Sequence, residues 1–128
     1  MFEIMATFSG CSVNDLALAR EFYVSKLGCT VEDESMGLQL RLPSGQSHFL
    51  YQKDDHVPAG FTVLNFVVSD IGAAINQLTA DGVSMERYDS LPAPQDEQGV
   101  LRGKAAGMGP DIAWFKDPAG NILAILEN

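Results

Sequence analysis

The feature that most constrains the fold is an internal repeat of helix-forming segments. Residues 14–27 and 70–81 both carry apolar side chains at the spacing of one helix face. Each segment opens with residues that cap helix N-termini and stops at a glycine, a common helix end. One constant shift along the chain places Val13-Asn14-Asp15-Leu16 on Val68-Ser69-Asp70-Ile71. We therefore predict two helices at equivalent places in two copies of one motif.

A second, larger shift relates the turns that follow the helices. It places Leu42-Pro43-Ser44-Gly45-Gln46 on Asp117-Pro118-Ala119-Gly120-Asn121. Chance similarity between two amphipathic helices does not explain a shared Pro-x-Gly turn. The repeat therefore predicts an α+β fold made of two tandem βαβββ modules. We expect one domain over residues 1–128, with the first module at about residues 4–53, a link at 54–60 and the second module at about 61–128.

Short strand patterns flank the two helices. Residues 38–42 read Leu-Gln-Leu-Arg-Leu, the alternation of a strand with one buried face. The other strands are predicted at residues 5–11, 29–32, 48–53, 62–68, 83–86, 112–116 and 122–127. Residues 89–110 contain four glycines and three prolines, so we expect an irregular loop there. Such a loop is either a lid over a ligand or a passive connection at a sheet edge.

Composition limits the classes of protein to which this sequence can belong. With 128 residues, 46% hydrophobic and 20% charged, the chain can form one core and does not resemble a disordered chain. Its net charge of −9 and its lack of a basic stripe argue against nucleic acid and anionic membranes as partners. We recognise no signal peptide or membrane span, so the predicted location is cytoplasmic. Cys11 and Cys29 are then expected to be free thiols.

Three stretches together resemble one known superfamily. They are residues 8–28, residues 61–83 and residues 114–127, and the last contains an Asp-Pro-x-Gly-Asn turn before the final strand. They look like the vicinal oxygen chelate superfamily, which includes glyoxalase I, bleomycin-resistance proteins and extradiol dioxygenases. The resemblance implies a curved mixed sheet with helices on its convex face and a ligand in its concave groove. It also implies a homodimer in which the partner chain often completes the groove.

Metal-dependent members of this superfamily place one ligand, usually His or Glu, on each of four strands. The resemblance puts those four positions at Phe8, Phe49, Val63 and Ala124. None of these side chains has a lone pair for a divalent cation, so we predict no metal and no other cofactor.

The two histidines do not offer another metal site. By strand alternation, His48 points to the helix-covered side, where we expect a hydrogen bond within the sheet. His56 lies in the link beside two aspartates, where we expect a solvated side chain.

Strand alternation also selects the side chains that line the groove. The predicted set is aromatic with a few polar groups: Phe8, Gln39, Arg41, Phe49, Tyr51, Lys53, Val63, Asn65, Trp114 and Ala124. Sparse polar groups in an apolar lining are typical of small-molecule sites. Arg41 and Lys53 either hold an anionic group of the ligand or pair with surface acids. Phe49 and Trp114 either face the ligand or fill a core or dimer interface.

These features leave three functions open. The first is a metal-independent protein that binds an aromatic or apolar small molecule, for which no catalytic residue is predicted. The second is a glyoxalase-like lyase or isomerase that uses Tyr51 or Lys53 as acid or base and Arg41 to hold an oxyanion. The third is a protein–protein interaction module that uses the groove of the dimer or the loop at residues 89–110.

Overall fold

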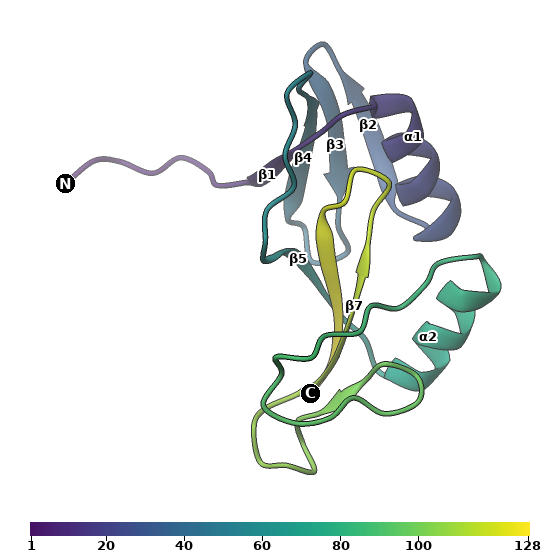
Figure 1. Cartoon of the computed structure of the whole chain (residues 1–128). Helices are drawn as coiled ribbons and strands as arrows, with labels where there is room; N and C mark the ends of the chain where they lie inside the picture. The colour runs from purple at the N-terminus through teal and green to yellow at the C-terminus, as the bar shows by residue number, and fades with distance from the viewer. The chain divides into compact units, whose positions relative to one another are not determined.

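The computed structural model describes all residues from 1 to 128 and divides them into two compact units (Figure 1). Unit 1 spans Met1–Pro58 and unit 2 spans Ala59–Asn128. Each unit has one helical segment and one four-stranded mixed sheet. The prediction of an α+β fold with two tandem modules is therefore confirmed.

Unit 1 contains β1 (Ser9–Val13), α1 (Leu16–Glu21), a π-helical turn η1 (Phe22–Lys26), β2 (Thr30–Glu34), β3 (Gly37–Arg41) and β4 (Ser47–Gln52). Its sheet has the order β1-β4-β3-β2, in which β1 runs parallel to β4 and the other pairs are antiparallel. The first strand starts later than predicted, and the segment before it extends away from the sheet (Figure 1).

The helical segment of unit 1 is capped and terminated by the residues that the sequence indicates. The Asp15 side chain accepts a hydrogen bond from the Leu18 backbone N–H at 3.1 Å. Gly28 adopts the left-handed conformation, with φ of 68°, after the π-helical turn. The core below this helix contains Tyr23, Leu40 and Leu50, which are fully buried.

Unit 2 contains β5 (Thr62–Val67), α2 (Ile71–Ala80), β6 (Leu101–Arg102), β7 (Asp111–Lys116) and β8 (Ile122–Glu127). Its sheet has the order β5-β8-β7-β6, with β5 parallel to β8, so it repeats the topology of unit 1. The Asp70 side chain caps α2 by accepting from the Ala73 N–H at 3.0 Å, as Asp15 caps α1. No helix in the chain is long and apolar enough to cross a membrane.

The predicted strand at residues 83–86 is wrong. Only Met85 forms an isolated bridge, to Phe115, and the edge strand is instead β6, which lies inside the predicted loop. The side chain of Gln95 explains the difference. Its Oε1 accepts from the Tyr88 N–H at 2.8 Å and its Nε2 donates to the Glu86 carbonyl at 3.1 Å. A strand at this edge of the sheet would use such backbone groups to pair with its neighbour, but here the Gln95 side chain already occupies them.

The loop at residues 89–110 is held to unit 2 by side chains. The Asp96 carboxylate accepts from the N–H groups of Gln98 and Val100, each at 2.9 Å, and from the Arg102 guanidinium at 2.9 Å. Burial acts to raise the pKa of the Asp96 carboxyl, but these hydrogen bonds outweigh it and lower that pKa. The Arg87 guanidinium donates to the backbone carbonyls at positions 96 and 97. Much of this loop is therefore braced by hydrogen bonds.

The two Pro-x-Gly turns of the repeat have the same backbone geometry. Leu42 N–H donates to the Gln46 carbonyl and Asp117 N–H donates to the Asn121 carbonyl, each at 3.0 Å. The glycine of each turn, Gly45 or Gly120, has a φ of 84°, which is a left-handed value that favours glycine. The turn signature that predicted the repeat thus corresponds to one geometry, used twice in the molecule.

Candidate functional site

In unit 1, two aromatic rings lie on the sheet face that the helix does not cover. Phe49 pairs in register with Gly10 and Gln39, while the residue that follows it, Leu50, is fully buried on the other face. Tyr51 lies two residues further along β4, and its ring stacks against that of Phe49, with centroids 6.2 Å apart and planes at 20°. Each ring has a glycine beside it on one neighbouring strand, Gly10 next to Phe49 and Gly37 next to Tyr51.

A hollow of about 250 Å³ opens beside the Phe49 ring. We call it the unit 1 hollow, and its lining residues are Phe8, Glu34, Ser35, Met36, Gln39 and Phe49. Three of these were predicted from strand alternation, and they come from three separate segments. The other three are Glu34, which ends β2, and the turn residues Ser35 and Met36, so a carboxylate and a thioether also line the hollow.

The predicted cationic side chains are engaged in ion pairs. Arg41 donates from Nε and Nη2 to the two carboxylate oxygens of Glu32, at 3.1 and 2.9 Å. This hydrogen bond and the nearby charge lower the pKa of the Glu32 carboxyl and raise that of the Arg41 guanidinium. Lys53 Nζ lies 2.9 Å from the Asp55 carboxylate, which raises the pKa of the lysine. Of the two alternatives left by the sequence, the structure shows pairing with surface acids.

The two histidines make different contacts from one another. His48 is only 1% exposed, and its Nδ1 and Nε2 lie 2.7 Å from Ser9 Oγ and 3.4 Å from Cys11 Sγ. The expectation of a hydrogen-bonded sheet histidine is therefore confirmed. The expectation of a solvated His56 is wrong, because its Nδ1 lies 2.6 Å from Ser12 Oγ and the residue is half-buried. A turn explains this, since the His56 N–H donates to the Lys53 carbonyl and brings the ring back to β1.

The residues of this chain do not fit the metal site of the metal-dependent relatives. The four positions assigned to ligands carry hydrocarbon side chains, as the sequence shows. No group of three or more His, Cys, Asp or Glu side chains in the structure could hold a metal ion.

In unit 2, the face away from the helix carries one ring in place of two. Trp114 and Asn65 both pair in register with Ala124, so the three share this face. The Trp114 Nε1–H donates to Thr62 Oγ1 at 3.1 Å, and the Tyr88 ring meets the indole edge-to-face at 5.6 Å. Neither Thr62 nor Tyr88 was among the predicted site residues.

A register shift in β5 explains why Thr62 was missed. The pairing with β8 slips between Thr62 and Leu64, and Val63 has no partner in the register. Simple alternation, which assumed a regular strand, placed Val63 beside Asn65 on the groove face. The bulge instead brings the Thr62 hydroxyl within hydrogen-bonding distance of the indole.

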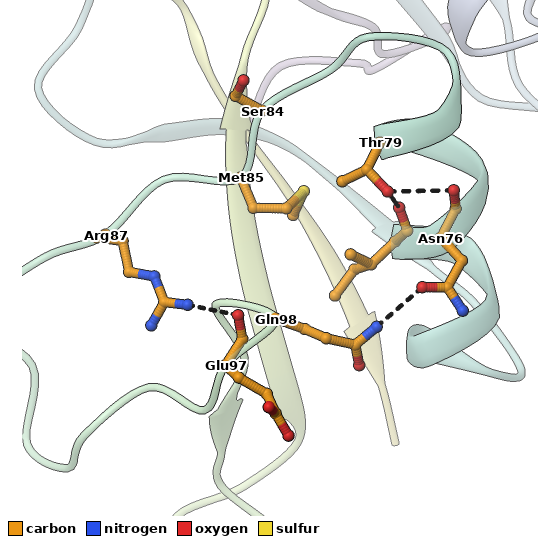
Figure 2. A pocket seen from close by; sticks show the side chains of 8 residues that line it. Asn76, Thr79, Ser84, Met85, Arg87, Glu97 and Gln98 are labelled. Carbon is orange, nitrogen blue, oxygen red and sulfur yellow. Dashed lines mark hydrogen bonds between the residues drawn. The ribbon is translucent and has the colours of Figure 1, made fainter.

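Another hollow, of about 400 Å³, lies beside α2 on the helix side of unit 2 (Figure 2). Its lining residues are Ile75, Asn76, Thr79, Ser84, Met85, Arg87, Glu97 and Gln98, and none was predicted. Several polar side chains here bond to other groups of the protein. Gln98 Nε2 donates to Asn76 Oδ1 at 3.1 Å, and Thr79 Oγ1 donates to the Ile75 carbonyl at 2.9 Å (Figure 2). The unit 1 hollow, with its exposed rings, is the better candidate for a ligand.

Solved structures share this fold along almost the whole chain. The fosfomycin resistance protein FosX of Listeria monocytogenes is 12% identical, with a TM-score of 0.70 and coverage of 99% of this chain and 95% of that chain. TnmS3, an antibiotic binding protein from Streptomyces sp. CB03234, is 19% identical, with a TM-score of 0.64 and 98% of each chain covered. A glyoxalase family protein from Enterococcus faecalis is 23% identical, with a TM-score of 0.68 and coverage of 99% and 100%. At these identities the likeness shows a common fold.

The assignment to a family rests on the amino-acid sequence. No curated protein is significantly similar to this chain. The family model described as "Glyoxalase/Bleomycin resistance protein/Dioxygenase superfamily" matches residues 8–125, which include both modules and both Pro-x-Gly turns. This chain therefore belongs to the glyoxalase/bleomycin resistance protein/dioxygenase superfamily.

Proposed function

We propose that this protein binds a small, positively charged aromatic molecule in the unit 1 hollow and needs no metal to do so. The observation that carries the proposal is the composition of that hollow. Two phenylalanine rings, the Met36 thioether and the Gln39 amide line it together with the carboxylate of Glu34. Its volume of about 250 Å³ suits a ligand of one or two rings, somewhat below the roughly 300–1,000 Å³ of drug-sized sites.

The physical chemistry of these groups favours a cation over a neutral ring. The face of an aromatic ring attracts a positive charge, and so does a carboxylate at the edge of the hollow. The net charge of −9 raises the local concentration of cations around the protein. TnmS3, which shares the fold, is described as an antibiotic binding protein, and this supports small-molecule binding as the general class.

A matched pair of probes tests the proposal. Isothermal titration should give heat with N-methylquinolinium and much weaker binding with neutral quinoline, which has nearly the same shape. Phe49→Ala should weaken N-methylquinolinium binding by about tenfold, and Glu34→Gln by about fivefold. Asp33→Asn removes an equal charge from the other face of β2 and should leave binding nearly unchanged. Absence of heat, or equal binding of both probes, contradicts the proposal.

One contact favours a second candidate, an acid–base lyase or isomerase. The Ser12 hydroxyl and His56 imidazole lie 2.6 Å apart, and Ser12 pairs in register with Tyr51 on the face that carries the rings. Lys53 suits the role of base less well, because its ion pair raises its pKa. Turnover of the methylglyoxal–glutathione hemithioacetal, lost in His56→Ala, would establish this function. The third candidate, a protein–protein module, has no observation of its own in its favour.

We also propose that the protein is a cytoplasmic homodimer. Large apolar side chains project into solvent from the segment before β1, among them Met1, Phe2, Ile4 and Met5. A second copy that covered them would remove this apolar area from water. Both cysteines are free thiols, which suits a reducing compartment. Native mass spectrometry should show a dimer that weakens when Phe2 and Ile4 are replaced by serine, and a monomer would contradict this.

A further inference from the structure

The hollow beside α2 in unit 2 offers a ligand different groups from those of the unit 1 hollow (Figure 2). Its volume of about 400 Å³ lies within the roughly 300–1,000 Å³ of small-molecule sites. Most of its polar lining residues are exposed, so a molecule in solution can reach them. The lining combines one positive and one negative side chain with amides, hydroxyls and two apolar side chains, and it contains no aromatic ring.

The guanidinium of Arg87 is held in place and still has donors for a ligand. Its Nη1 and Nη2 donate to the backbone carbonyls of Asp96 and Glu97, at 2.7 and 2.6 Å. A guanidinium carries five N–H groups, so these two bonds fix its orientation and leave the others unused. An arginine with several N–H groups available can bind a carboxylate through two parallel hydrogen bonds. The hollow therefore offers an oriented partner for a carboxylate.

The side chain of Glu97 supplies the opposite charge. Arg87 bonds to the backbone carbonyl of Glu97 and not to its carboxylate (Figure 2). The carboxylate itself makes no hydrogen bond or ion pair within the chain. A carboxylate accepts strong, charge-assisted hydrogen bonds from an ammonium group. Arg87 and Glu97 are thus neighbours whose opposite charges are both available to a ligand.

The rest of the lining is uncharged. Gln98 Nε2 donates to Asn76 Oδ1 at 3.1 Å. The Thr79 hydroxyl donates to the Ile75 carbonyl at 2.9 Å. Ile75 and the half-buried Met85 add apolar surface, and a methionine side chain adapts to apolar groups of different shape. This part of the hollow suits an uncharged, apolar group.

We propose that the hollow beside α2 binds a free amino acid with an apolar side chain, independently of the unit 1 hollow. The carboxylate of the amino acid accepts from Arg87, its ammonium group donates to Glu97, and its side chain packs against Met85. A zwitterion provides a partner for both charges of the hollow, whereas a simple cation or anion leaves one of them without a partner. Because a zwitterion has no net charge, the net charge of −9 of the protein does not repel it.

Three related probes test the need for both charges. They are L-leucine, L-leucinamide, which lacks the carboxylate, and N-acetyl-L-leucine, which lacks the ammonium group. In a nitrogen-15 NMR spectrum the side-chain amide peaks of Asn76 and Gln98 report on this hollow, and that of Gln39 reports on the unit 1 hollow. L-leucine should shift the first two peaks and leave the third in place. Each derivative should bind about tenfold more weakly, as the loss of one charged contact predicts. If L-leucine moves neither peak, or if L-leucinamide binds as tightly, the site is disproved.

Two matched variants test the assigned partner of the ammonium group. Glu97→Gln changes a side chain that makes no bond within the chain, so this variant should fold. It should weaken L-leucine binding about tenfold and leave the weak binding of N-acetyl-L-leucine unchanged. Asp89→Asn removes an equal charge from an exposed side chain outside the hollow and should have no effect. Undiminished binding in Glu97→Gln, or equal losses in the two variants, would overturn the proposal. Phe49→Ala separates the two sites, because it should weaken N-methylquinolinium binding and spare L-leucine.

Discussion

The two units have one scaffold but place their rings on different strands. The same shift that superposes the two Pro-x-Gly turns makes the pair Gln39 and Phe49 of unit 1 equivalent to the pair Trp114 and Ala124 of unit 2. In unit 1 the ring is on the last strand and the smaller polar side chain is on its neighbour. In unit 2 the ring is on that neighbouring strand, and the equivalent position of the last strand is Ala124, which has only a methyl group. The repeat therefore preserves the backbone while each open face has its own shape and chemistry.

The ends of the sheets differ in the same way. In each unit the last strand supplies a side-chain oxygen to the first N–H of the helix, Gln52 Oε1 to Leu16 at 3.1 Å and Glu127 Oε1 to Ile71 at 2.9 Å. The contact is geometrically the same, but only the second is ionisable. Equivalent positions in the repeat thus share a structural role and differ in charge.

The largest effect should come from a substitution that makes the Pro-x-Gly turn of unit 2 like that of unit 1. Asp117 is buried, and its carboxylate accepts from the N–H groups of Ala119 and Asn121 at 2.9 Å and from Asn121 Nδ2 at 3.0 Å. Asp117→Leu copies the unit 1 residue, Leu42, and removes these bonds. We expect a loss of about 3 kcal/mol in the free energy of unfolding, measured with urea. Ser44→Ala, at an exposed turn position, is the control, and equal stability of both variants would mean that the carboxylate is dispensable.

The next largest effect should come from a variant that gives unit 2 the aromatic ring that unit 1 carries at the equivalent position. Ala124 is fully buried beside Trp114, whereas the equivalent Phe49 is partly exposed beside the unit 1 hollow. Ala124→Phe should therefore overpack unit 2 and lower the free energy of unfolding by about 2 kcal/mol. Thermal unfolding followed by circular dichroism measures this. A variant as stable as the parent would show that the face of unit 2 can accept the ring of unit 1.

A smaller effect, of opposite sign, should come from Tyr88. Removing a buried hydroxyl without a partner relieves its desolvation cost, so Tyr88→Phe should stabilise the ligand-free protein by about 1 kcal/mol. Tyr51→Phe alters a side chain that is 39% exposed and should be nearly neutral. Urea titration of the two variants side by side makes the comparison. Destabilisation by Tyr88→Phe would reveal a bond of the hydroxyl in solution.

The smallest effect distinguishes the two helix contacts by pH. A hydrogen bond from Lys104, then one from the Ile71 N–H, lowers the pKa of the Glu127 carboxyl from its ordinary value of 4.5. A lowered folded-state pKa means that its contribution to stability is complete above pH 4.5 and is lost as the pH falls through the folded-state pKa. The Ile71 amide peak in NMR should therefore move with a midpoint below 4.5, and that of Leu16 should not follow it. Glu127→Gln should abolish the movement, and a shared midpoint for both amides would contradict the assignment.

Much of the fold could be predicted because it is encoded by short, local signals. The cap aspartates, the terminating glycines and the Pro-x-Gly turns each act within a few residues of themselves, and all of them behave as the sequence indicates. Strand alternation also placed Phe49 and Gln39 on one face, because β3 and β4 are regular. Two of the side chains that line the unit 1 hollow, Phe49 and Gln39, follow from that regularity.

The features that escaped prediction depend on partners distant in the sequence. Residues 83–86 do not form the predicted strand because the Gln95 side chain bonds to the backbone there. The contact between His56 and Ser12 joins residues that are 44 positions apart in the sequence. The bulge that places Thr62 beside Trp114 cannot be recognised from the pattern of residues in β5. Tyr88 stood out only when its surroundings were known, because an unsatisfied hydroxyl is a property of its neighbours and not of its own residue type.

The carboxylate of Glu127 contacts two separate parts of unit 2 at once. One oxygen accepts from the first amide of α2, and the other accepts from Lys104 in the long loop, whose own backbone N–H donates to Asp111 at 3.1 Å. The last strand thus joins the start of α2 to the part of the long loop around Lys104. Replacing Glu127 would therefore remove one support from the helix and one from the loop at the same time.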